Sequence, residues 1–536
     1  MIIEDRRKLK VFIPTAGIGS RLKNFTKNLN KCLVEIGQKP AISHIIDNFP
    51  ENAEFVIALG FDALKVKDFL KLTYPKKKFY FVYVDKFSGP NSSLGYSMQC
   101  SRKYLQSPFF FVACDSVFFN KINSQTKNWI GYSKLVDKKN YRKLTFKKNK
   151  IVKDIHEKNY KKNFNYSYVG VASILDYKQF WRGIDKTSDK FRKLGEIYGL
   201  KYLCQNSKIF SKELNWYDVG NMKSYLFNKK KFYNKNLNIL PKENESIWFI
   251  NDKVVKFSQD QEFIKKRVYR QKLLKNFTPK ILNYKKNFFL YKKVDGEVLS
   301  KKLNLKNFKN LLKILKVFWK KKKIRQSYFE QKCNDFYKAK TRKRINIFIK
   351  KFNSQDKITL INGKKVSIIR KELSKIDWKN ISKGIPVNFH GDLHFENILL
   401  NKNKFYFLDW RQDFSKLKHC GDLYYDLAKL MHGIIVDHNK VSKDLYGIKK
   451  KGRSILIELK MDKINIQVMS YFEKWILKNK YDLTKVRILT ALIFLNIAPL
   501  HHQPYSFFLF QLGKYLLNDI KNFEYIKLAR NEKFNS

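Results

Sequence analysis

Residues 10–22, K-V-F-I-P-T-A-G-I-G-S-R-L, limit the possible folds more strongly than any other part of the chain. The apolar run predicts a buried strand, and two glycines then break it into a loop whose backbone can approach a ligand closely. The N–H groups that lead into a following helix favour anions, and the guanidinium of Arg21 adds donors that match phosphate oxygens. The stretch therefore predicts a phosphate-binding loop after a buried strand.

A second motif, N-K-C-L at residues 30–33, follows the glycine loop. Together the two motifs resemble the signature of nucleotidyltransferases that join a nucleoside triphosphate to a phosphorylated small molecule, and the resemblance covers roughly residues 8–230. It implies that Lys31 neutralises charge developing at the attacked α-phosphate. The family usually has proline before this lysine, whereas this chain has Asn30. The resemblance also implies that the triphosphate is held by Gly17, Gly19, Ser20 and Arg21.

Apolar runs at residues 55–61 and 79–84 are separated by helix-like stretches, an alternation typical of a parallel sheet. Such sheets bind ligands at the carboxyl ends of their strands. The run P-F-F-F-V-A-C-D places Asp115 at the end of a wholly apolar strand. Asp115 is therefore predicted to hold Mg²⁺ between the triphosphate and its phosphate acceptor. An aspartate that only caps a turn is the alternative.

Two further stretches continue the resemblance. The turn G-P-N-S-S-L-G at residues 89–95 lies where the family reads the base, which implies contacts from Asn91 and Ser92. The stretch W-Y-D-V-G-N at residues 216–221 is similar to the family's closing motif and makes Asp218 the second Mg²⁺ ligand. Two carboxylates can hold the metal that neutralises repulsion between two phosphate groups.

The second half of the chain contains H-G-D-L-H-F-E-N at residues 390–397, followed by F-Y-F-L-D-W. The spacing of Asp392, Asn397 and Asp409 resembles the catalytic loop and metal aspartate of kinases. With C-G-D-L-Y-Y-D-L-A further on, it is closer to the choline kinase and aminoglycoside phosphotransferase superfamily. Asp392 would accept or orient the proton of the attacking hydroxyl, Asn397 and Asp409 would hold Mg²⁺ on the phosphates of ATP, and His390 would brace the loop.

The same superfamily uses a strand lysine that pairs with the ATP phosphates, and Lys256 is the candidate. Its usual partner is a helical glutamate, but the helix expected after Lys256 is nearly all basic and offers only Glu262. The stretch at 288–297 fits the hinge strand that contacts adenine. His394 is interpreted as a residue of the loop or of the substrate side. Asp422 and Asp426 either tie the following helix to the loop or contact substrate.

The predicted fold is an α/β nucleotidyltransferase domain, Rossmann-like with a mostly parallel sheet, followed by an α+β protein-kinase-like phosphotransferase domain. The boundaries are drawn from composition and motif positions. They are a first domain at 1–230, a linker at 231–245, and a second domain at 246–536 with a small N-lobe at 246–297 and a helical C-lobe at 298–536.

Composition restricts the partners. The formal charge is +65, but the lysines are scattered through nearly every segment, which favours a solvated surface over a specific nucleic-acid site and leaves a weak attraction to anionic surfaces. The six cysteines form no C-x-x-C pair and are expected to be reduced thiols. No signal peptide or membrane span is predicted; the apolar run at 489–500, interrupted by Asn496 and Pro499, is expected to be a buried helix. A cytoplasmic location follows.

Two sites for activated phosphates on one chain suggest consecutive reactions. A kinase would use ATP to phosphorylate a small alcohol, and a nucleotidyltransferase would couple the product to a second nucleotide, with Mg²⁺ at both sites. Choline, CTP and the product CDP-choline, used for surface glycan or lipid decoration, are one hypothesis. A sugar kinase with a sugar-phosphate nucleotidyltransferase, making a nucleotide sugar for capsule or lipopolysaccharide, is another. A polyanion-binding scaffold with inactive domains is a third.

Aromatic residues of the second half bear on the choline hypothesis. Such rings can surround a quaternary ammonium, but they can equally fill a core, which a chain with 15% aromatic residues favours. His501 and His502, between two prolines, are expected in a loop near the substrate. The rings are Trp410, Tyr424, Tyr425, Tyr471, Phe472, Trp475 and Tyr505.

Overall fold

The strand predicted at the start of the chain lies inside a nine-stranded sheet, between parallel neighbours on both sides. The structure is a computed structural model that describes residues 8–134, 141–158, 160, 166–187, 195–232, 244–354, 356–436, 441, 446–459 and 461–523. The chain divides into two compact units. The first comprises Met1–Leu237, Pro241–Asp260 and Asn283–Leu290, and the second Asn238–Leu240, Gln261–Leu282 and Tyr291–Ser536.

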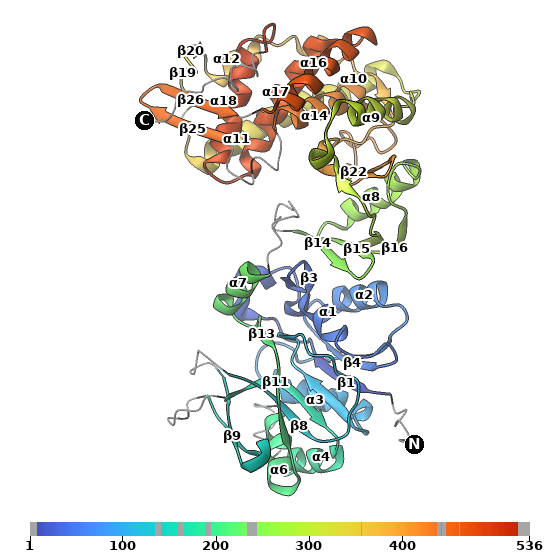
Figure 1. Ribbon diagram of the computed structural model, residues 1–536, viewed down its shortest axis with the longest axis vertical. Coiled ribbons are helices and arrows are strands. Elements are labelled where there is room, and N and C mark those ends of the chain that lie inside the picture. The colour runs from blue at the N-terminus through green and yellow to red at the C-terminus, as the bar shows by residue number, and fades with distance from the viewer. Residues whose placement is uncertain are drawn as a thin grey trace. The chain divides into compact units, whose positions relative to one another are not determined.

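The first unit contains the α/β domain (Figure 1). Its strands are β1 (Lys10–Pro14), β2 (Glu35–Ile36), β3 (Lys39–Pro40), β4 (Glu54–Leu59), β5 (Lys78–Tyr83), β6 (Phe109–Val112), β7 (Ser116–Phe118), β8 (Trp129–Lys134), β9 (Lys143–Phe146), β10 (Val152–His156), β11 (Tyr166–Ile174), β12 (Phe210–Glu213) and β13 (Trp216–Asp218). Its helices are α1 (Ala41–Ile46), α2 (Ala63–Thr73), α3 (Leu94–Ser101), α4 (Tyr177–Asp185), α6 (Ile197–Asn206) and α7 (Met222–Lys231).

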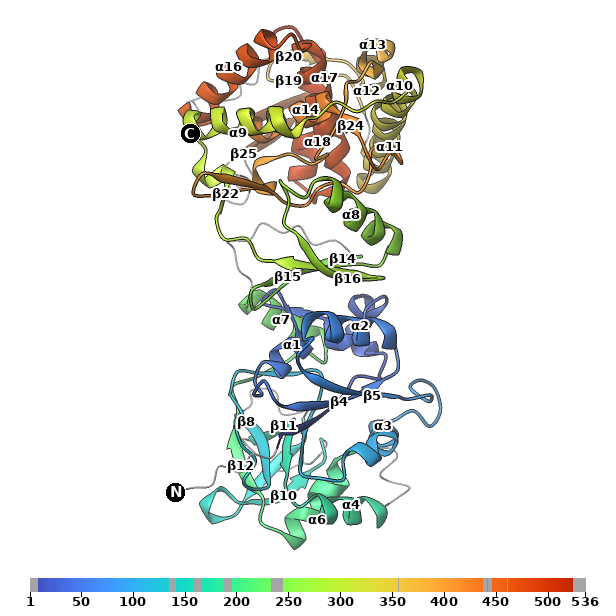
Figure 2. The same ribbon diagram turned by 90° about the vertical axis from the view of Figure 1, so that its right-hand side faces the viewer.

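The order of the main sheet is β10-β9-β11-β6-β1-β4-β5, and β8 and β12 extend it beside β11. Strands β6, β1, β4 and β5 are parallel, whereas β11 pairs antiparallel with β6. Successive side chains of a strand point to opposite faces. Accordingly Val11 and Ile13 pack with α1 and α2, while Phe12 packs with α3, α4 and α6 on the other face. Figure 2 shows these two helical layers. The predicted α/β architecture is confirmed.

A four-stranded sheet follows, in the order β14 (Glu245–Ile250), β15 (Lys253–Ser258), β17 (Phe288–Lys292) and β16 (Ile281–Lys285). The rings of Trp248 and Phe69 lie 5.3 Å apart, so β14 belongs to the core of the first unit. The predicted N-lobe at 246–297 is therefore divided between the two units. Most of the predicted linker at 231–245 lies outside the described residues.

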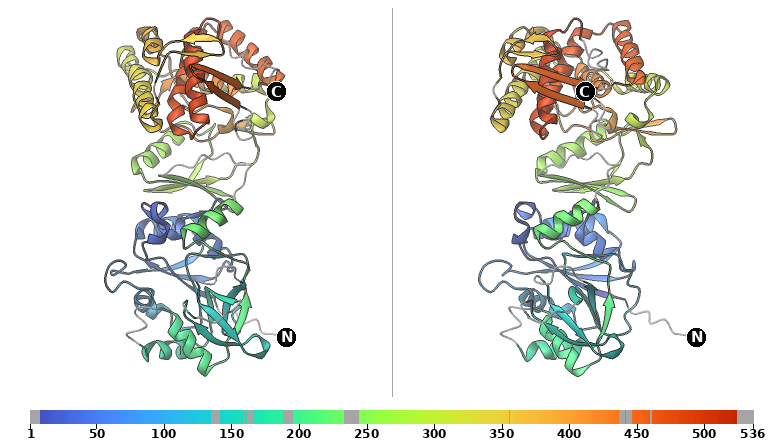
Figure 3. Two further views of the ribbon diagram at one scale, coloured as in Figure 1. Left: turned by 90° about the vertical axis from the view of Figure 1, so that its left-hand side faces the viewer. Right: turned by 60° about the vertical axis from the view of Figure 1, so that its left-hand side comes forward.

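The second unit is largely helical (Figure 3), and its short sheets are antiparallel except for the parallel pair of β19 with β26. Its helices are α8 (Gln261–Leu273), α9 (Leu305–Phe318), α10 (Gln326–Asn334), α11 (Lys340–Phe352), α12 (Ile369–Ser374), α13 (Trp378–Ser382), α14 (Leu423–Ile435), α16 (Lys463–Lys478), α17 (Leu483–Ile497) and α18 (Tyr505–Asn518). Its strands are β18 (Glu297–Val298), β19 (Thr359–Ile361), β20 (Lys364–Val366), β21 (Pro386–Val387), β22 (Ile398–Asn401), β23 (Lys404–Phe407), β24 (Gly421–Asp422), β25 (Tyr446–Lys451) and β26 (Ser454–Leu459).

Helix α14 forms the centre of the second unit, because all of its residues are buried and α17 packs along it. Helix α17 in turn packs against α11 and α18, as expected for the buried helix predicted at 489–500. Among the described residues one stretch, Leu483–Leu500, is long and apolar enough to cross a membrane, and 61% of it is buried inside the protein. A helix buried in a protein core can have the same length and apolar composition as a membrane span.

Phe110 on β6 tests the core of the first unit. It is fully buried, with its ring 5.4 Å from Phe49 and 5.9 Å from Trp129. We expect Phe110→Ala to lower the free energy of unfolding by about 3–5 kcal/mol, measured on the urea transition of the first unit. The matched control Phe227→Ala removes a ring that is 70% exposed on α7 and should change it by less than about 0.5 kcal/mol. Equal effects would contradict the assigned core.

Candidate functional site

The loops that follow β6, β1, β4 and β5 meet at one edge of the sheet, because these parallel strands all end there. The glycine motif follows β1, and Asp115 follows β6. Strand β13 pairs antiparallel with β7, with Asp218 directly opposite Ser116. The topology thus brings the two predicted metal ligands, Asp115 and Asp218, to the same place although they are far apart in the sequence.

Lys31 and Asp115 form the ion pair at the middle of this site, with Nζ 3.2 Å from Oδ2. Nη2 of Arg21 lies 3.8 Å from the same oxygen, and the Arg21 side chain is 63% exposed. Burial alone would lower the pKa of Lys31, but Asp115 raises it above its ordinary value. Burial alone would raise the pKa of Asp115, but Lys31 and Arg21 hold it below its ordinary value. Both groups are therefore charged at neutral pH.

Asn30, which stands where the family usually has proline, fixes the turn that carries Lys31. Its Nδ2 donates to the carbonyls of Thr15, at 2.8 Å, and Phe61, at 2.6 Å, and its Oδ1 accepts from the N–H of Cys32 at 3.0 Å. The side chain is fully buried. The amide thus holds the start of the 3₁₀ turn Lys31–Leu33 against the ends of β1 and β4.

Asp218 is held by three donors: the hydroxyl of Tyr141 at 2.8 Å, the N–H of Gly220 at 2.9 Å and Nδ2 of Asn221 at 2.5 Å. A Cβ atom at Gly220 would lie only 2.5 Å from Oδ2 of Asp115 and 3.1 Å from Oδ1 of Asp218. Glycine at this position therefore lets the two carboxylates face one space. Burial and the charge of Asp115 raise the pKa of Asp218.

This pair of carboxylates fits Mg²⁺, which prefers oxygen ligands and takes one or two carboxylates together with phosphate oxygens and water. Burial and the negative charge of Asp115 raise the pKa of Asp218, and a cation bound between the two carboxylates would balance this charge. No group of three or more His, Cys, Asp and Glu side chains suited to a metal is found in the part of the chain that the structure describes. The remaining ligands would come from the substrate phosphates and water.

The other predicted residues of the first site lie in the surrounding loops. Gly17 and Ser20 are exposed, and a Cβ at Gly17 would meet nothing within 4 Å. The helix predicted after the glycine loop is instead a 3₁₀ helix, Ser20–Thr26. Asn91 and Ser92 lie in the turn before α3, and no hydrogen bond or ion pair between described residues joins them to Asp115.

Two contributors were missed by sequence reasoning, Tyr141 and Lys158. The hydroxyl of Tyr141 donates to Asp218. Burial and the charge of Arg21 lower the pKa of Lys158, while the charge of Asp218 opposes this shift. Neither belongs to a motif with a recognisable spacing, and only the folded sheet brings them to the site.

The loop at 390–397 forms the second site, in the second unit. Nδ2 of Asn397 donates to the carbonyl of Asp392 at 2.9 Å and lies 3.3 Å from its Oδ2. Nε2 of His394 is 3.1 Å from the same amide nitrogen. The predicted acid and amide thus meet, and His394 completes the turn.

His390 is hydrogen-bonded through both nitrogens of its ring. Its Nε2 lies 2.8 Å from the carbonyl of Leu408, and its Nδ1 accepts from the N–H of Asp392 at 3.3 Å. Burial lowers the pKa of His390 to about 3, so the ring is neutral. The first of these hydrogen bonds joins the loop to Leu408, which follows β23 and precedes Asp409, and the second lies within the loop.

Two side chains of α14, one helical turn apart, contact the loop at 390–397. Asp426 accepts from the N–H groups of His390 and Gly391, both at 2.8 Å, and burial raises its pKa to about 6. Nζ of Lys429 lies 2.8 Å from Oδ1 of Asp392, and Lys429 is only 7% exposed. Asp426 therefore ties the helix to the loop, as one of the two predicted interpretations has it. Lys429 was not predicted.

The predicted metal ligand Asp409 is paired with an arginine: Nη1 of Arg267 on α8 lies 2.6 Å from its Oδ1. Arg270, one turn along, donates to the carbonyls of Phe389 and Arg411. Two of the basic residues that make α8 depart from the kinase pattern are therefore used in contacts within the second unit. The helix presents cations to the ends of the strand and loop that carry Asp392 and Asp409.

Two further residues predicted for the second site fall in different units. Lys256 belongs to the first unit, where it is half-buried on β15, opposite Ile247. Glu262 pairs with Lys265 at 3.5 Å, with both side chains mostly exposed. The ring of Tyr505 is buried against His501 at 4.8 Å.

Most of the rings considered for choline binding are core residues. Trp410, Tyr424, Tyr425, Phe472 and Tyr505 are buried. Several rings are covered by the protein's own lysines: Lys485 lies 4.3 Å from the ring centre of Tyr424, Lys309 5.0 Å from Tyr471 and Lys316 5.6 Å from Trp475.

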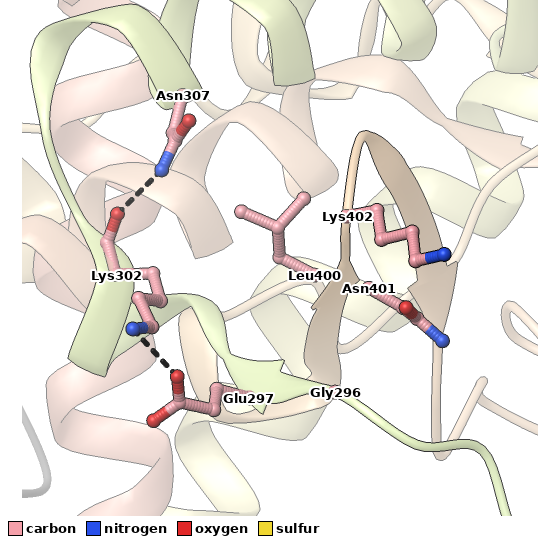
Figure 4. Close-up of a pocket in the computed structure, with 7 residues that line it drawn as sticks. All are labelled: Gly296, Glu297, Lys302, Asn307, Leu400, Asn401 and Lys402. Atoms are coloured by element: carbon pink, nitrogen blue, oxygen red, sulfur yellow. Dashed lines mark hydrogen bonds and ion pairs between the residues drawn. The ribbon is translucent and has the colours of Figure 1, made fainter.

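A pocket of the second unit opens beside the β18–β22 ladder (Figure 4). Glu297 there pairs with Nζ of Lys302 at 2.6 Å, and Nδ2 of Asn307 donates to the carbonyl of Lys302 at 2.8 Å. Gly296 and Glu297, which line this pocket, belong to the stretch 288–297 that was interpreted as the hinge strand, whereas no other predicted site residue lines it.

Comparison with known proteins finds similarity to the first half of the chain. A bifunctional protein GlmU of Methanococcus vannielii is 27% identical over 244 residues, covering 43% of this chain and 56% of that protein. A choline-phosphate cytidylyltransferase of Streptococcus pneumoniae is 34% identical over 115 residues, covering 21% of this chain and 47% of that protein. The chain spans about half the length of these curated relatives.

Among solved structures, that of CTP:phosphocholine cytidylyltransferase from Streptococcus pneumoniae aligns with a TM-score of 0.37 and 21% identity, over 42% of this chain and all of that chain. A UDP-glucose pyrophosphorylase complexed with UDP-glucose aligns with a TM-score of 0.36 and 15% identity, over 42% of this chain and 99% of that chain. No family model matches the sequence.

The paired carboxylates predict pH-dependent binding of Mg²⁺. Because the pKa of Asp218 is raised, this carboxyl is the one that takes up a proton as the pH falls, and the proton competes with the metal. We expect added Mg²⁺ to raise the melting temperature of the first unit more at about pH 7.5 than at about pH 5. Asp218→Asn should remove this difference, whereas Asp154→Asn, at a 48% exposed site, should keep it. A pH-independent shift in the wild type would contradict the assignment.

Proposed function

We propose that the chain is a bifunctional enzyme that phosphorylates a small alcohol with ATP and then couples the product to a second nucleotide. The observation that carries the nucleotidyl transfer is the assembly of Lys31, Asp115 and Asp218 at the carboxyl edge of a parallel sheet, together with the exposed Arg21. The similarity of the same half to a choline-phosphate cytidylyltransferase supports CTP as the nucleotide.

In the proposed nucleotidyl transfer, a phosphate oxygen of the acceptor attacks the α-phosphorus of the triphosphate, and pyrophosphate leaves. Arg21 binds phosphate oxygens from the open side of the site, and Lys31 balances negative charge at the attacked phosphorus. Bound Mg²⁺ supplies positive charge that reduces the repulsion between the two phosphate groups. Asp115 and Asp218 would hold it, and Asn30 keeps Lys31 in position.

In the proposed phosphorylation, the hydroxyl of the acceptor approaches Oδ1 or Oδ2 of Asp392. Lys429 holds the pKa of Asp392 well below its ordinary value even though burial opposes this. The aspartate therefore orients the hydroxyl and takes its proton late, as the bond to phosphorus forms. Asn397 and Asp409 would hold Mg²⁺ on the ATP phosphates, and Arg267 must then leave Asp409.

The nucleotidyl transfer is tested by release of pyrophosphate from CTP, or from the other nucleoside triphosphates, with phosphocholine and sugar phosphates as acceptors. Lys31→Met should lower the rate about 100- to 1000-fold, because it removes a cation aimed at charge in the transition state. Lys103→Met, at an exposed position away from the site, should leave the rate unchanged. A rate that survives in Lys31→Met would overturn the assignment of this site.

The independence of the two sites is tested with Asp392→Asn. This variant should lose ATP consumption by at least about 100-fold, since the acceptor hydroxyl is no longer oriented, but should still release pyrophosphate from a supplied phosphorylated acceptor. Loss of both activities would mean that the sites are coupled. If the wild type phosphorylates neither choline nor ethanolamine nor any sugar, and no anionic alcohol either, the chain is better explained as a polyanion-binding scaffold with inactive enzyme domains.

A further inference from the structure

The most distinctive feature of the second site is a cluster of four basic side chains around Asp392. Lys429 lies 2.8 Å from its Oδ1. Arg411 packs closely against Gly391, the residue before Asp392, since a Cβ at Gly391 would lie 2.6 Å from Cβ of Arg411. Arg411 and Lys340 both lie on the ring of Phe336, at 4.9 Å and 4.3 Å from its centre.

Arg344 is the fourth member, one turn beyond Lys340 on α11. Burial lowers the pKa of Arg344, and the charge of Arg411 lowers it further. The cluster thus consists of Lys340, Arg344, Arg411 and Lys429, which come from two helices and from the loop after β23.

Few negative charges balance this cluster. Among the residues that the structure describes, no carboxylate forms an ion pair with Lys340, Arg344 or Arg411, and Asp392 is shared with Lys429. Burial and the charges of Arg411 and Lys429 lower the pKa of Lys340 well below its ordinary value. The site holds more positive charge than its own residues neutralise, and an anionic ligand would relieve the repulsion.

The cluster lies on the acceptor side of the reacting aspartate. Oδ2 of Asp392 faces Asn397, the predicted metal ligand, whereas Oδ1 faces Lys429. The Asp392 side chain is 36% exposed, so a substrate can reach it. A hydroxyl that approaches Asp392 from the side opposite the metal therefore meets Lys429 and its neighbours.

We infer that the alcohol phosphorylated by the second unit carries a negative charge of its own, as a carboxylate or a phosphate, and that Lys340, Arg344 and Arg411 bind this group. The inference rests on the proposed phosphotransfer and names its substrate class. The hydroxyl oxygen of the acceptor bonds to the γ-phosphorus of ATP, the bond to the ADP oxygen breaks, and the hydroxyl proton passes to Asp392 and then to water. A quaternary ammonium such as choline would instead be repelled by the cluster.

The test measures ATP consumption by the full chain with three classes of alcohol. The anionic class contains glycerate and gluconate as carboxylates and glycerol 3-phosphate and ribose 5-phosphate as phosphates. The neutral class contains glycerol, glucose and ribose, and the cationic class contains choline and ethanolamine. We expect turnover with a member of the anionic class, with kcat/KM at least about tenfold above its neutral counterpart.

Substitutions in the basic cluster test which side chains bind the anionic group of the acceptor. Lys340→Met and Arg344→Gln should each raise KM for the anionic acceptor about 10- to 100-fold and leave KM for Mg-ATP unchanged, because each removes one charge-assisted hydrogen bond. Lys340→Arg, which keeps the charge, should recover most of the affinity. Lys343→Met, an exposed residue of the same helix, serves as the control and should match the wild type. Thermal melting shows whether each variant is folded.

The outcomes separate this inference from the proposed function. Turnover with choline or a neutral alcohol, while the anionic class is inert, keeps the kinase and overturns the inference. A rise in KM for Mg-ATP alone in Lys340→Met would mean that the cluster binds the γ-phosphate, which also overturns it. If no alcohol of any class is phosphorylated, the proposed phosphotransfer itself fails, and the inference fails with it.

Discussion

Each unit contains, at its candidate site, one ion pair between a mostly buried lysine and an aspartate: Lys31 with Asp115 at 3.2 Å, and Lys429 with Asp392 at 2.8 Å. A charge that leaves water must be compensated by a partner and by hydrogen bonds. The surrounding structure supplies both. Asn30 holds the turn of Lys31, and Asp426 holds the loop of Asp392 by its backbone. The two pairs hold the pKa of both aspartates below the ordinary value, so both carboxylates are ionised at neutral pH.

The residues predicted from sequence are those whose chemistry is tied to a local pattern. A buried strand that ends in glycines predicted the loop before Arg21, and an apolar strand that ends in an acid predicted Asp115. The spacing of Asp392 and Asn397 lies within one short loop, and the structure brings the two together. The parallel strands and the buried helix at 489–500 follow from periodicity and length and are confirmed.

The residues that were missed depend on tertiary packing. Lys429 reaches Asp392 only because α14 passes beneath the loop, and Gly220 matters only because β13 pairs with β7. The role of Asn30 could be noticed in the sequence as a departure from a family pattern, but its three hydrogen bonds join segments far apart in the chain. The pairing of Arg267 with Asp409 likewise gives the basic helix α8 a function that composition could not indicate.

The two proposed activities are joined by one phosphate, which the second unit would place on the acceptor and the first would then link to a nucleotide. The most direct measurement supplies ATP labelled at the γ-phosphate, unlabelled CTP and the alcohol that supports turnover, and follows the label by chromatography. Consecutive action predicts label in the phosphate of the nucleotide conjugate next to the acceptor, with unlabelled pyrophosphate. Label in pyrophosphate, or a labelled acceptor that never enters a nucleotide conjugate, would contradict it.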